Sequence, residues 1–269
     1  MQSWHFLGSV PESYERFLVP QIFAPWAEDL IEIAALQAGE RVLDIACGTG
    51  IVARIAASRL GNRGSVVGLD TSAAMLDTAR AAATAEGAAV EWREGDALDQ
   101  PFTDGAFEVV LCQQGLQFFP DKPRGLREMH RVLRPGGRIV LSVWGPIERS
   151  PGFAVLAEAL TRHLDHHAGG LLASGPFSLS DAGALRGLIA GANFQDIDIR
   201  RVTKTLRYPS VEEFVLGYVS GSVLAGVVGD ADEGARSALL AEVGAKLAPA
   251  IDDQGLRFPI ETNIATAHT

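Results

Sequence analysis

The chain has 269 residues, of which 47% are hydrophobic and 21% charged, a composition that supports a packed core and excludes global disorder. Acidic residues outnumber basic ones by 33 to 23, and the resulting net charge of −10 disfavours nucleic acid as a partner. The two cysteines, Cys47 and Cys112, form no CxxC pair, which argues against a disulfide scaffold or a cysteine zinc site and fits a reducing cytoplasm.

Membrane insertion is not expected. The first residues lack the basic start and apolar run of a secretory signal. The longest uncharged apolar stretch of the C-terminal half, Phe214–Gly229, is too short and too glycine-rich to span a bilayer, and we expect it to form a buried helix lining a pocket. The sequence therefore predicts a cytoplasmic protein.

Short apolar runs alternate with helical segments between residues 40 and 145. The predicted strands are 41–46, 65–69, 89–94, 107–112 and 138–144, and the predicted helices are 51–60, a segment capped by Ser72 that ends near Gly87, and a segment opened by Asp121. This alternation predicts parallel βαβ units with right-handed crossovers.

The remainder is less regular. We expect a helical segment 150–177 broken at Gly169–Gly170, a helix from Ser180 or Asp181 to about Gly191, strands 196–208 and 258–266, and two helices within 210–250. The predicted fold is thus α/β, with a doubly wound, mostly parallel, seven-stranded sheet. We predict one domain: N-terminal cap helices over 1–36, a cofactor core over 37–147, helical lids over 148–179 and 209–252, and segments 180–208 and 253–269 completing the sheet. Lids at these places would lie over the carboxyl ends of the strands, where open α/β sheets bind ligands.

A glycine-rich loop follows the first predicted strand and opens a helix. Gly48-Thr49-Gly50-Ile51-Val52-Ala53 fits the G-x-G-x-x-G/A pattern of nucleotide-type cofactor sites. Asp44 discriminates between cofactors, because a carboxylate there would repel the pyrophosphate of a dinucleotide. S-adenosylmethionine carries an ammonium and a sulfonium instead, and Asp44 can attract both. The competing interpretation is that Asp44 only ties down its own loop.

Two further carboxylates end the next strands. Asp70, twenty residues after Gly50, can accept both hydroxyls of a ribose, which suits NAD as well as S-adenosylmethionine. Asp96, between Gly95 and Ala97, can accept a hydrogen bond from an adenine amino group, although a turn aspartate is the common role of such a residue.

Five segments resemble, in order, the motifs of class I S-adenosylmethionine-dependent methyltransferases, nearest to the group that includes the ubiquinone and menaquinone C-methyltransferases. These segments are 42–50, 68–75, 95–98, 107–119 and 131–137, and the resemblance is good over residues 10–145. It implies a Rossmann-like methyltransferase fold and cofactor contacts from Asp44, Gly48, Gly50, Asp70, Thr71, Met75, Gly95, Asp96, Ala97 and Gln113. Ala46 departs from the glycine that many members have, and alanine is small enough to leave room for the cofactor. Tyr14, Phe17 and Leu18 match the N-terminal helix that often covers the cofactor in this family; ordinary packing of a terminal amphipathic helix explains them equally well.

Methyl transfer is an in-line displacement whose rate can come from alignment and exclusion of water, so no catalytic triad is needed and no catalytic residue is assigned. The acceptor is expected to be a partly apolar small molecule with an oxygen, nitrogen or carbon acceptor atom. Candidate acceptor contacts are Gln117, Phe118, Trp144, His163 and Tyr218, with His5 a weaker one. His163 and His167 have a spacing that a metal could use, but a solvated helix end is the better interpretation and no metal is expected.

Two other functions stay open. One is a nicotinamide-dependent oxidoreductase, which would explain the glycine pattern. Asp44 and Asp96 count against it. A noncatalytic S-adenosylmethionine-binding regulatory module would keep the fold without an acceptor cavity. The oligomeric state is not indicated.

Overall fold

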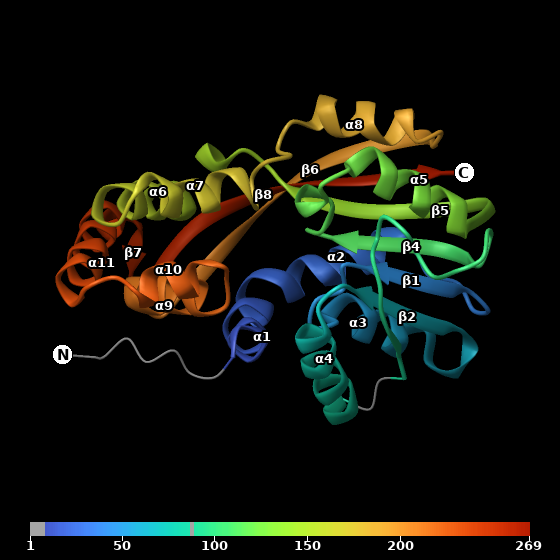
Figure 1. The fold of residues 1–269 in the computed structure, drawn as a ribbon, viewed down its shortest axis with the longest axis horizontal. Helices are drawn as coiled ribbons and strands as arrows, with labels where there is room; N and C mark the ends of the chain where they lie inside the picture. The colour runs from blue at the N-terminus through green and yellow to red at the C-terminus, as the bar shows by residue number, and fades with distance from the viewer. Residues whose placement is uncertain (1–8, 87–88) are drawn as a thin grey trace. The chain divides into compact units, whose positions relative to one another are not determined.

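The computed structural model describes residues 9–86 and 89–269 (Figure 1). Its contacts group the chain into two compact units. The helical unit comprises residues up to Ile22, Trp144–Ser178 and Thr203–Glu261, and the sheet unit comprises Phe23–Val143, Leu179–Val202 and Thr262–Thr269. The predicted lid segments belong to the helical unit, apart from residue 179. His5 and the helix end expected at Gly87 lie outside the described residues.

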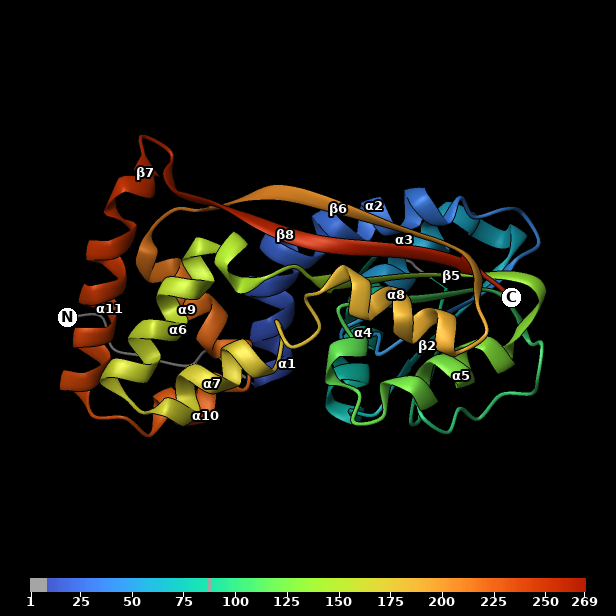
Figure 2. The same cartoon turned by 90° about the horizontal axis from the view of Figure 1, so that it is seen from above.

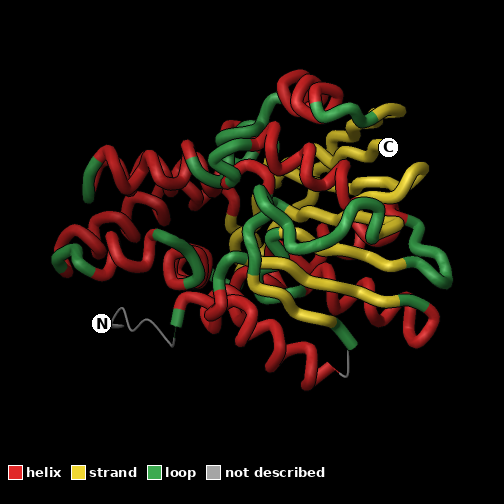
Figure 3. The backbone as a smooth tube through the Cα atoms, turned by 45° about the vertical axis from the view of Figure 1, so that its right-hand side comes forward, coloured by secondary structure: helices red, strands yellow, loops and turns green. Residues whose placement is uncertain are grey.

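Seven strands form one hydrogen-bonded path in the order β3-β2-β1-β4-β5-β8-β6, and the short β7 pairs with β8. Figure 3 draws strands in yellow and helices in red. Their bounds are β1 Arg41–Ile45, β2 Ser65–Asp70, β3 Glu91–Glu94, β4 Phe107–Gln113, β5 Leu133–Trp144, β6 Gln195–Tyr208, β7 Ile251–Asp252 and β8 Gly255–His268. Strands β1 to β5 are mutually parallel. The predicted doubly wound, mostly parallel, seven-stranded sheet is therefore confirmed.

Helices cover both faces of the sheet unit. They are α2 Ala24–Ala34, α3 Ile51–Leu60, α4 Ala73–Glu86, α5 Lys122–Val132 and α8 Ala182–Gly191, with 3₁₀ turns η2 Gly61–Arg63 and η3 Leu116–Phe118. Figure 2 shows α2 and α3 on one side of β5 and α5 and α8 on the other. Three helix starts follow the predicted capping residues, because side-chain oxygens of Ser72, Asp121 and Asp181 accept backbone N–H groups of the first turn.

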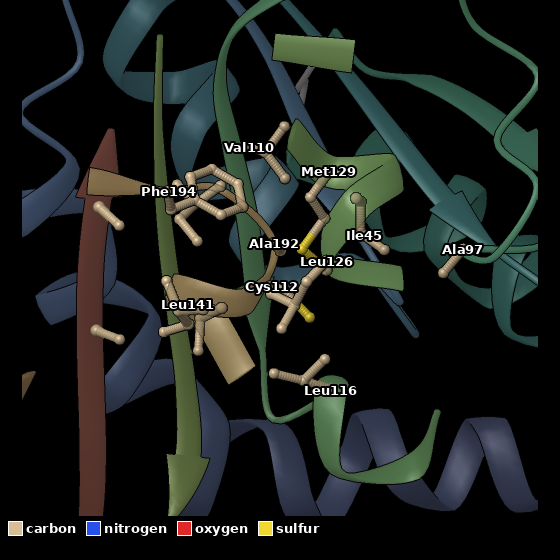
Figure 4. Packing of buried hydrophobic residues seen from close by; sticks show 14 of the residues in the cluster. Ile45, Ala97, Val110, Cys112, Leu116, Leu126, Met129, Leu141, Ala192 and Phe194 are labelled. Atoms are coloured by element: carbon tan, nitrogen blue, oxygen red, sulfur yellow. The ribbon is translucent and has the colours of Figure 1, made fainter. Parts of the chain in front are cut away.

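One hydrophobic core cluster of the sheet unit lies between the strands and the helices α5 and α8. Ile45, Val110 and Leu141 come from neighbouring strands and are fully buried against Leu126 and Met129 of α5 (Figure 4). Because side chains alternate along a strand, Asp44 and Leu111 point to the opposite face, on which α3 packs. The carboxyl group of Asp44 is thereby directed at the start of α3.

The helical unit contains α1 Val10–Ser13, a π-helix η1 Tyr14–Phe23 that ends at the first residue of the sheet unit, η4 Ile147–Arg149, α6 Pro151–His163, α7 His166–Ser174, α9 Val211–Ser220, α10 Leu224–Gly229, α11 Glu233–Leu247 and η5 Ala248–Ala250. Its centre is an aromatic cluster in which the Phe153 ring contacts the rings of Phe177, Phe214, Tyr218 and Phe258. Within the described residues, no helix combines the length and apolar character that a membrane crossing requires.

Two sequence-based predictions about the helical unit are wrong. Gly169 and Gly170 lie inside α7, and the break comes earlier, where the Asp165 side chain accepts the Ala168 N–H at 2.7 Å and starts a new helix. A capping aspartate thus interrupts the helix where the glycines do not. Residues 210–250 form three helices rather than two, because residues 221–223 leave the helical path after α9, with Val223 71% exposed.

Candidate active site

The loop between β1 and α3 takes a backbone path that few residues tolerate. Ala46, Gly48 and Gly50 have φ values of 54°, 55° and 85°, all in the left-handed region. A Cβ on Gly50 would lie 2.2 Å from the Trp92 ring, whereas a Cβ on Gly48 would meet nothing within 4 Å. Gly50 therefore serves the packing of Trp92 as well as the turn, and Gly48 leaves open space at the loop.

Asp44 is a carboxyl group enclosed by protein, with 1% of its surface exposed. Its Oδ2 accepts the backbone N–H of Ala53, in the first turn of α3, at 3.1 Å. Burial raises the pKa of Asp44 well above its ordinary value, the Ala53 hydrogen bond opposes this, and the negative charge of Asp70 raises the pKa further. No positively charged side chain of the described residues pairs with the ionised Asp44 carboxylate. A bound cation would therefore stabilise the ionised form.

Asp70 connects two loops at the carboxyl edge of the sheet. Its Oδ2 accepts the Gly48 N–H at 2.8 Å, and its Oδ1 accepts the Ser72 N–H at 2.9 Å. Each carboxylate oxygen has room for a second donor. The geometry is therefore that of a half-buried carboxylate fixed by backbone groups, with acceptor capacity left for two hydroxyls.

The third strand ends in a turn that Asp96 closes. Asp96 is exposed, and its Oδ1 accepts the Leu98 N–H at 2.8 Å, which is the role of a turn aspartate. Gly95 donates its N–H to the Asp70 carbonyl at 3.0 Å, so the ends of β2 and β3 are joined. Ala97 is buried, Met75 is half-buried and Thr71 is exposed. The cofactor contacts predicted from Asp44 to Ala97 thus gather at one edge of the sheet unit.

Glutamines stand at and after the end of β4, and two of them, Gln114 and Gln117, form a buried polar chain. Gln113 donates from Nε2 to the Phe23 carbonyl at 2.9 Å, at the start of α2. Gln117 donates to Gln114 Oε1 at 3.2 Å, and Gln114 donates to the Thr262 hydroxyl at 2.9 Å. Phe118 is 58% exposed beside this buried pair. Gln117 thus holds the chain after β4 in place, while Phe118 presents an apolar ring to its surroundings.

Tyr14, Trp144, His163 and Tyr218 belong to the helical unit. Tyr14 begins the π-helix, Trp144 ends β5 with 5% exposure, and Tyr218 is buried against the Phe153 ring. His163 Nε2 lies 2.6 Å from Glu242 Oε2, so its imidazole links α6 to α11. No three histidine, cysteine, aspartate or glutamate residues of the described chain gather in a way that would hold a metal ion.

Two features of the site were not predicted from the sequence: the buried hydroxyl of Thr49 and the left-handed backbone of Gln114, a residue that the sequence did offer as an acceptor-side candidate. The Thr49 hydroxyl in the glycine loop is buried and has no hydrogen-bond partner in the described residues. Gln114 has a φ of 53°, a left-handed conformation that its 2.9 Å hydrogen bond to the Ser142 carbonyl helps to hold. Thr49 could have been found from the sequence, because it is the middle residue of the G-x-G pattern. No local sequence signal indicates the left-handed backbone of Gln114.

Comparisons with known proteins find similarity in the central part of the chain. Residues 42–137 match the family described as the methyltransferase domain. A 2-phytyl-1,4-naphtoquinone methyltransferase of Synechococcus elongatus is 40% identical over 118 residues, which cover 43% of this chain and 51% of that protein. A demethylmenaquinone methyltransferase of Thermus thermophilus is 40% identical over 121 residues, covering 45% and 54% respectively. The chain thus spans about half the length of the curated relatives it matches.

Among solved structures, a putative methyltransferase from Bacillus halodurans superposes with a TM-score of 0.60 at 23% identity, over 90% of this chain and 97% of that one. This likeness concerns the fold, which is the Rossmann-like α/β fold of the methyltransferases. The match over residues 42–137 confirms the predicted resemblance for that part of the chain. The relatives at 40% identity are named as quinone methyltransferases, the group that the sequence motifs indicated.

Proposed function

We propose that this protein is an S-adenosylmethionine-dependent methyltransferase acting on a partly apolar small molecule. The observation that carries the proposal is Asp44, a buried carboxyl group with a raised pKa at the end of β1, beside a glycine loop. A site for a pyrophosphate would place an anion next to this carboxyl, which is electrostatically unfavourable. The charge of Asp44 therefore counts against the nicotinamide-dependent alternative.

The residues fit a cationic sulfur nucleoside. Asp44 has no cation of its own among the described residues, Asp70 keeps acceptor capacity on both oxygens, and Gly48 has open space where a side chain would stand. We infer that Asp44, Gly48, Gly50, Asp70, Met75, Asp96 and Ala97 hold the cofactor. When bound, S-adenosylmethionine supplies a methyl group on a positively charged sulfur.

The chain's own contribution is binding, orientation and exclusion of water. Asp44 holds positive charge at a buried position, where electrostatic attraction is stronger than in water. The Asp70 carboxylate is prevented from rotating by the Gly48 and Ser72 N–H groups, so its free acceptor positions point in fixed directions. Alignment and desolvation account for catalysis in this proposal, and no general base is assigned.

The acceptor that we propose is an aromatic or quinone-like compound. Two relatives at 40% identity are named for naphthoquinone and demethylmenaquinone substrates, and the exposed Phe118 ring follows β4 at the carboxyl edge of the sheet. We also propose a reducing, cytoplasmic location, because Cys47 and Cys112 are both free thiols buried in the sheet unit. No nucleic-acid partner is proposed.

The test is transfer of a labelled methyl group from S-adenosylmethionine to a panel of hydroxylated naphthalenes and benzoquinols. We expect turnover by the full chain and a loss of roughly tenfold or more in cofactor affinity in Asp70→Ala, because two ribose hydrogen bonds to a charged group disappear. Asp253→Ala is the matched control, since Asp253 makes no side-chain hydrogen bond with the described residues. Cofactor binding without turnover on any acceptor would favour the regulatory module and overturn the proposal.

A further inference from the structure

The helical unit contains a pocket of about 250 Å³ that none of the cofactor residues line. Its walls come from the π-helix η1, the end of β6 and the helix α9, all within the same unit. The lining residues are Arg16, Phe17, Gln21, Tyr208, Pro209, Glu213, Leu216, Gly217 and Ser220. π-helical geometry of the kind seen in η1 is uncommon and occurs frequently at functional sites.

The spacing of residues on α9 explains the shape of the pocket. Glu213, Leu216, Gly217 and Ser220 follow the i, i+3, i+4, i+7 pattern and therefore form one stripe along the helix. A Cβ on Gly217 would lie 3.3 Å from Phe17 Cβ, so the missing side chain lets η1 approach α9 closely. The close approach at Gly217 fixes one side of the pocket, and Leu216 and Phe17 give it apolar walls.

The charged groups of the pocket have opposite signs and form no ion pair within the part of the chain that the structure describes. The Arg16 guanidinium lies over the Phe17 ring, 5.0 Å from its centroid, and makes no ion pair with the described residues. The Glu213 carboxylate likewise makes no ion pair or hydrogen bond with them, although its backbone N–H bonds to Ser210. Arg16 and Glu213 are exposed, whereas Ser220 is only 8% exposed. The charges therefore stand at the opening, and a hydroxyl lies deeper.

We propose that this pocket binds a small zwitterion with an aromatic ring, of the aromatic amino acid type. The ammonium would pair with Glu213 and the carboxylate with Arg16, so that both unpaired charges of the opening are matched. The ring would pack between Phe17, Pro209 and Leu216, with a ring hydroxyl within reach of Ser220. A neutral quinol would leave the two charges uncompensated. This site goes beyond the proposed function, because it needs neither the glycine loop nor a methyl donor.

The test measures binding to the full chain by calorimetric titration without S-adenosylmethionine, so its failure is separate from failure of methyl transfer. The probes are L-phenylalanine, phenylacetate, which lacks the ammonium, and phenethylamine, which lacks the carboxylate. We expect L-phenylalanine to bind about two- to fivefold more tightly than either analogue, because exposed ion pairs of this kind contribute up to about fivefold each. Equal binding of all three probes, or tighter binding of 1,4-dihydroxynaphthalene than of L-phenylalanine, would overturn the proposal.

Variants assign the two charges separately. Glu213→Gln should abolish the preference for L-phenylalanine over phenylacetate, and Arg16→Gln should abolish the preference over phenethylamine. The matched control is Glu212→Gln, which removes the adjacent charge from the same first turn of α9 without touching the pocket lining. Leu216→Trp should fill the pocket and remove binding of every probe. Circular dichroism of each variant verifies folding, and unchanged binding in folded Leu216→Trp would contradict the site.

Discussion

Replacement of Asp44 by asparagine separates the stability of the protein from its affinity for a cation. Asparagine has nearly the same shape, and its side-chain oxygen can keep the 3.1 Å hydrogen bond from the Ala53 N–H. The substitution therefore removes the charge and leaves the packing of β1 against α3 intact. We expect opposite effects on unfolding and on cofactor binding.

The effect on unfolding follows from proton linkage. Burial raises the pKa of Asp44 in the folded state, so between its unfolded and folded pKa values the native protein binds more protons than the unfolded chain. Its stability consequently falls as the pH rises through that window, by about 1.4 kcal/mol per pH unit for a single group. The stability of Asp44→Asn does not fall in this way. Its free energy of unfolding should therefore equal that of the wild type in acid and exceed it at pH 8.

The effect on binding has the opposite sign. A hydrogen bond to a charged partner contributes about 1.5–3 kcal/mol, so the affinity of Asp44→Asn for S-adenosylmethionine should fall roughly 10- to 150-fold. Wild-type affinity should rise with pH, because the cation favours the ionised carboxylate, and the variant should show no such rise. Urea unfolding and calorimetric titration at several pH values measure both quantities. A variant that binds S-adenosylmethionine as tightly as the wild type would refute the electrostatic reasoning.

Four further substitutions test individual features of the structure. Ala46→Gly should stabilise the protein by about 0.5–1 kcal/mol in urea unfolding. A left-handed alanine costs about 1–2 kcal/mol, and the backbone entropy of glycine in the unfolded chain offsets part of the relief. A lower urea midpoint in the variant would contradict the strain at Ala46. Tyr208→Phe should raise stability by about 1 kcal/mol, because it removes a buried hydroxyl that has no hydrogen-bond partner among the described residues; a loss would reveal a partner. Burial opposes ionisation of Glu242, yet hydrogen bonds from Lys246 and His163 hold its pKa below the ordinary value. Glu242→Gln should therefore lower the melting temperature at pH 7 and match the wild type in acid, where the glutamate is protonated; a constant difference at both pH values would exclude the charge effect. Asp165→Ala should lower the free energy of unfolding by about 1 kcal/mol and speed hydrogen exchange at the start of α7. Unchanged exchange there would show that the cap is dispensable.

Much of the fold could be predicted because its signals are local. Helix α3 was predicted with the same bounds, and the starts of α4, α5 and α8 were marked by capping side chains three residues before the N–H groups they bind. The order of strand, glycine loop and helix around Gly48 and Gly50 is also contained in neighbouring residues. Parallel pairing follows once helices alternate with strands, since each crossover must return to the same edge.

The helical unit was predicted less well, because its helices end where tertiary packing and caps decide. Gly169 and Gly170 are helix-breaking in isolation, yet α7 packs on α6 and remains helical through them. Local propensity is a weak determinant compared with such packing. Asp165 is a residue type that commonly caps helices, but nothing in the neighbouring sequence indicated that the helix would break at Asp165 rather than at the two glycines.

The sequence by itself determined which residues end the strands, and therefore that Asp44, Asp70 and Asp96 would share one edge of a sheet. Only the tertiary structure decided what each carboxyl group does there. Asp44 is enclosed because α3 covers its face of the sheet, Asp70 is fixed by a loop 22 residues earlier in the chain, and Gln114 bonds to Thr262 across 148 residues. The pocket between η1 and α9 arises in the same way, from segments nearly 200 positions apart. Burial and long-range hydrogen bonds depend on which elements pack together, and that information lies in no local window of the sequence.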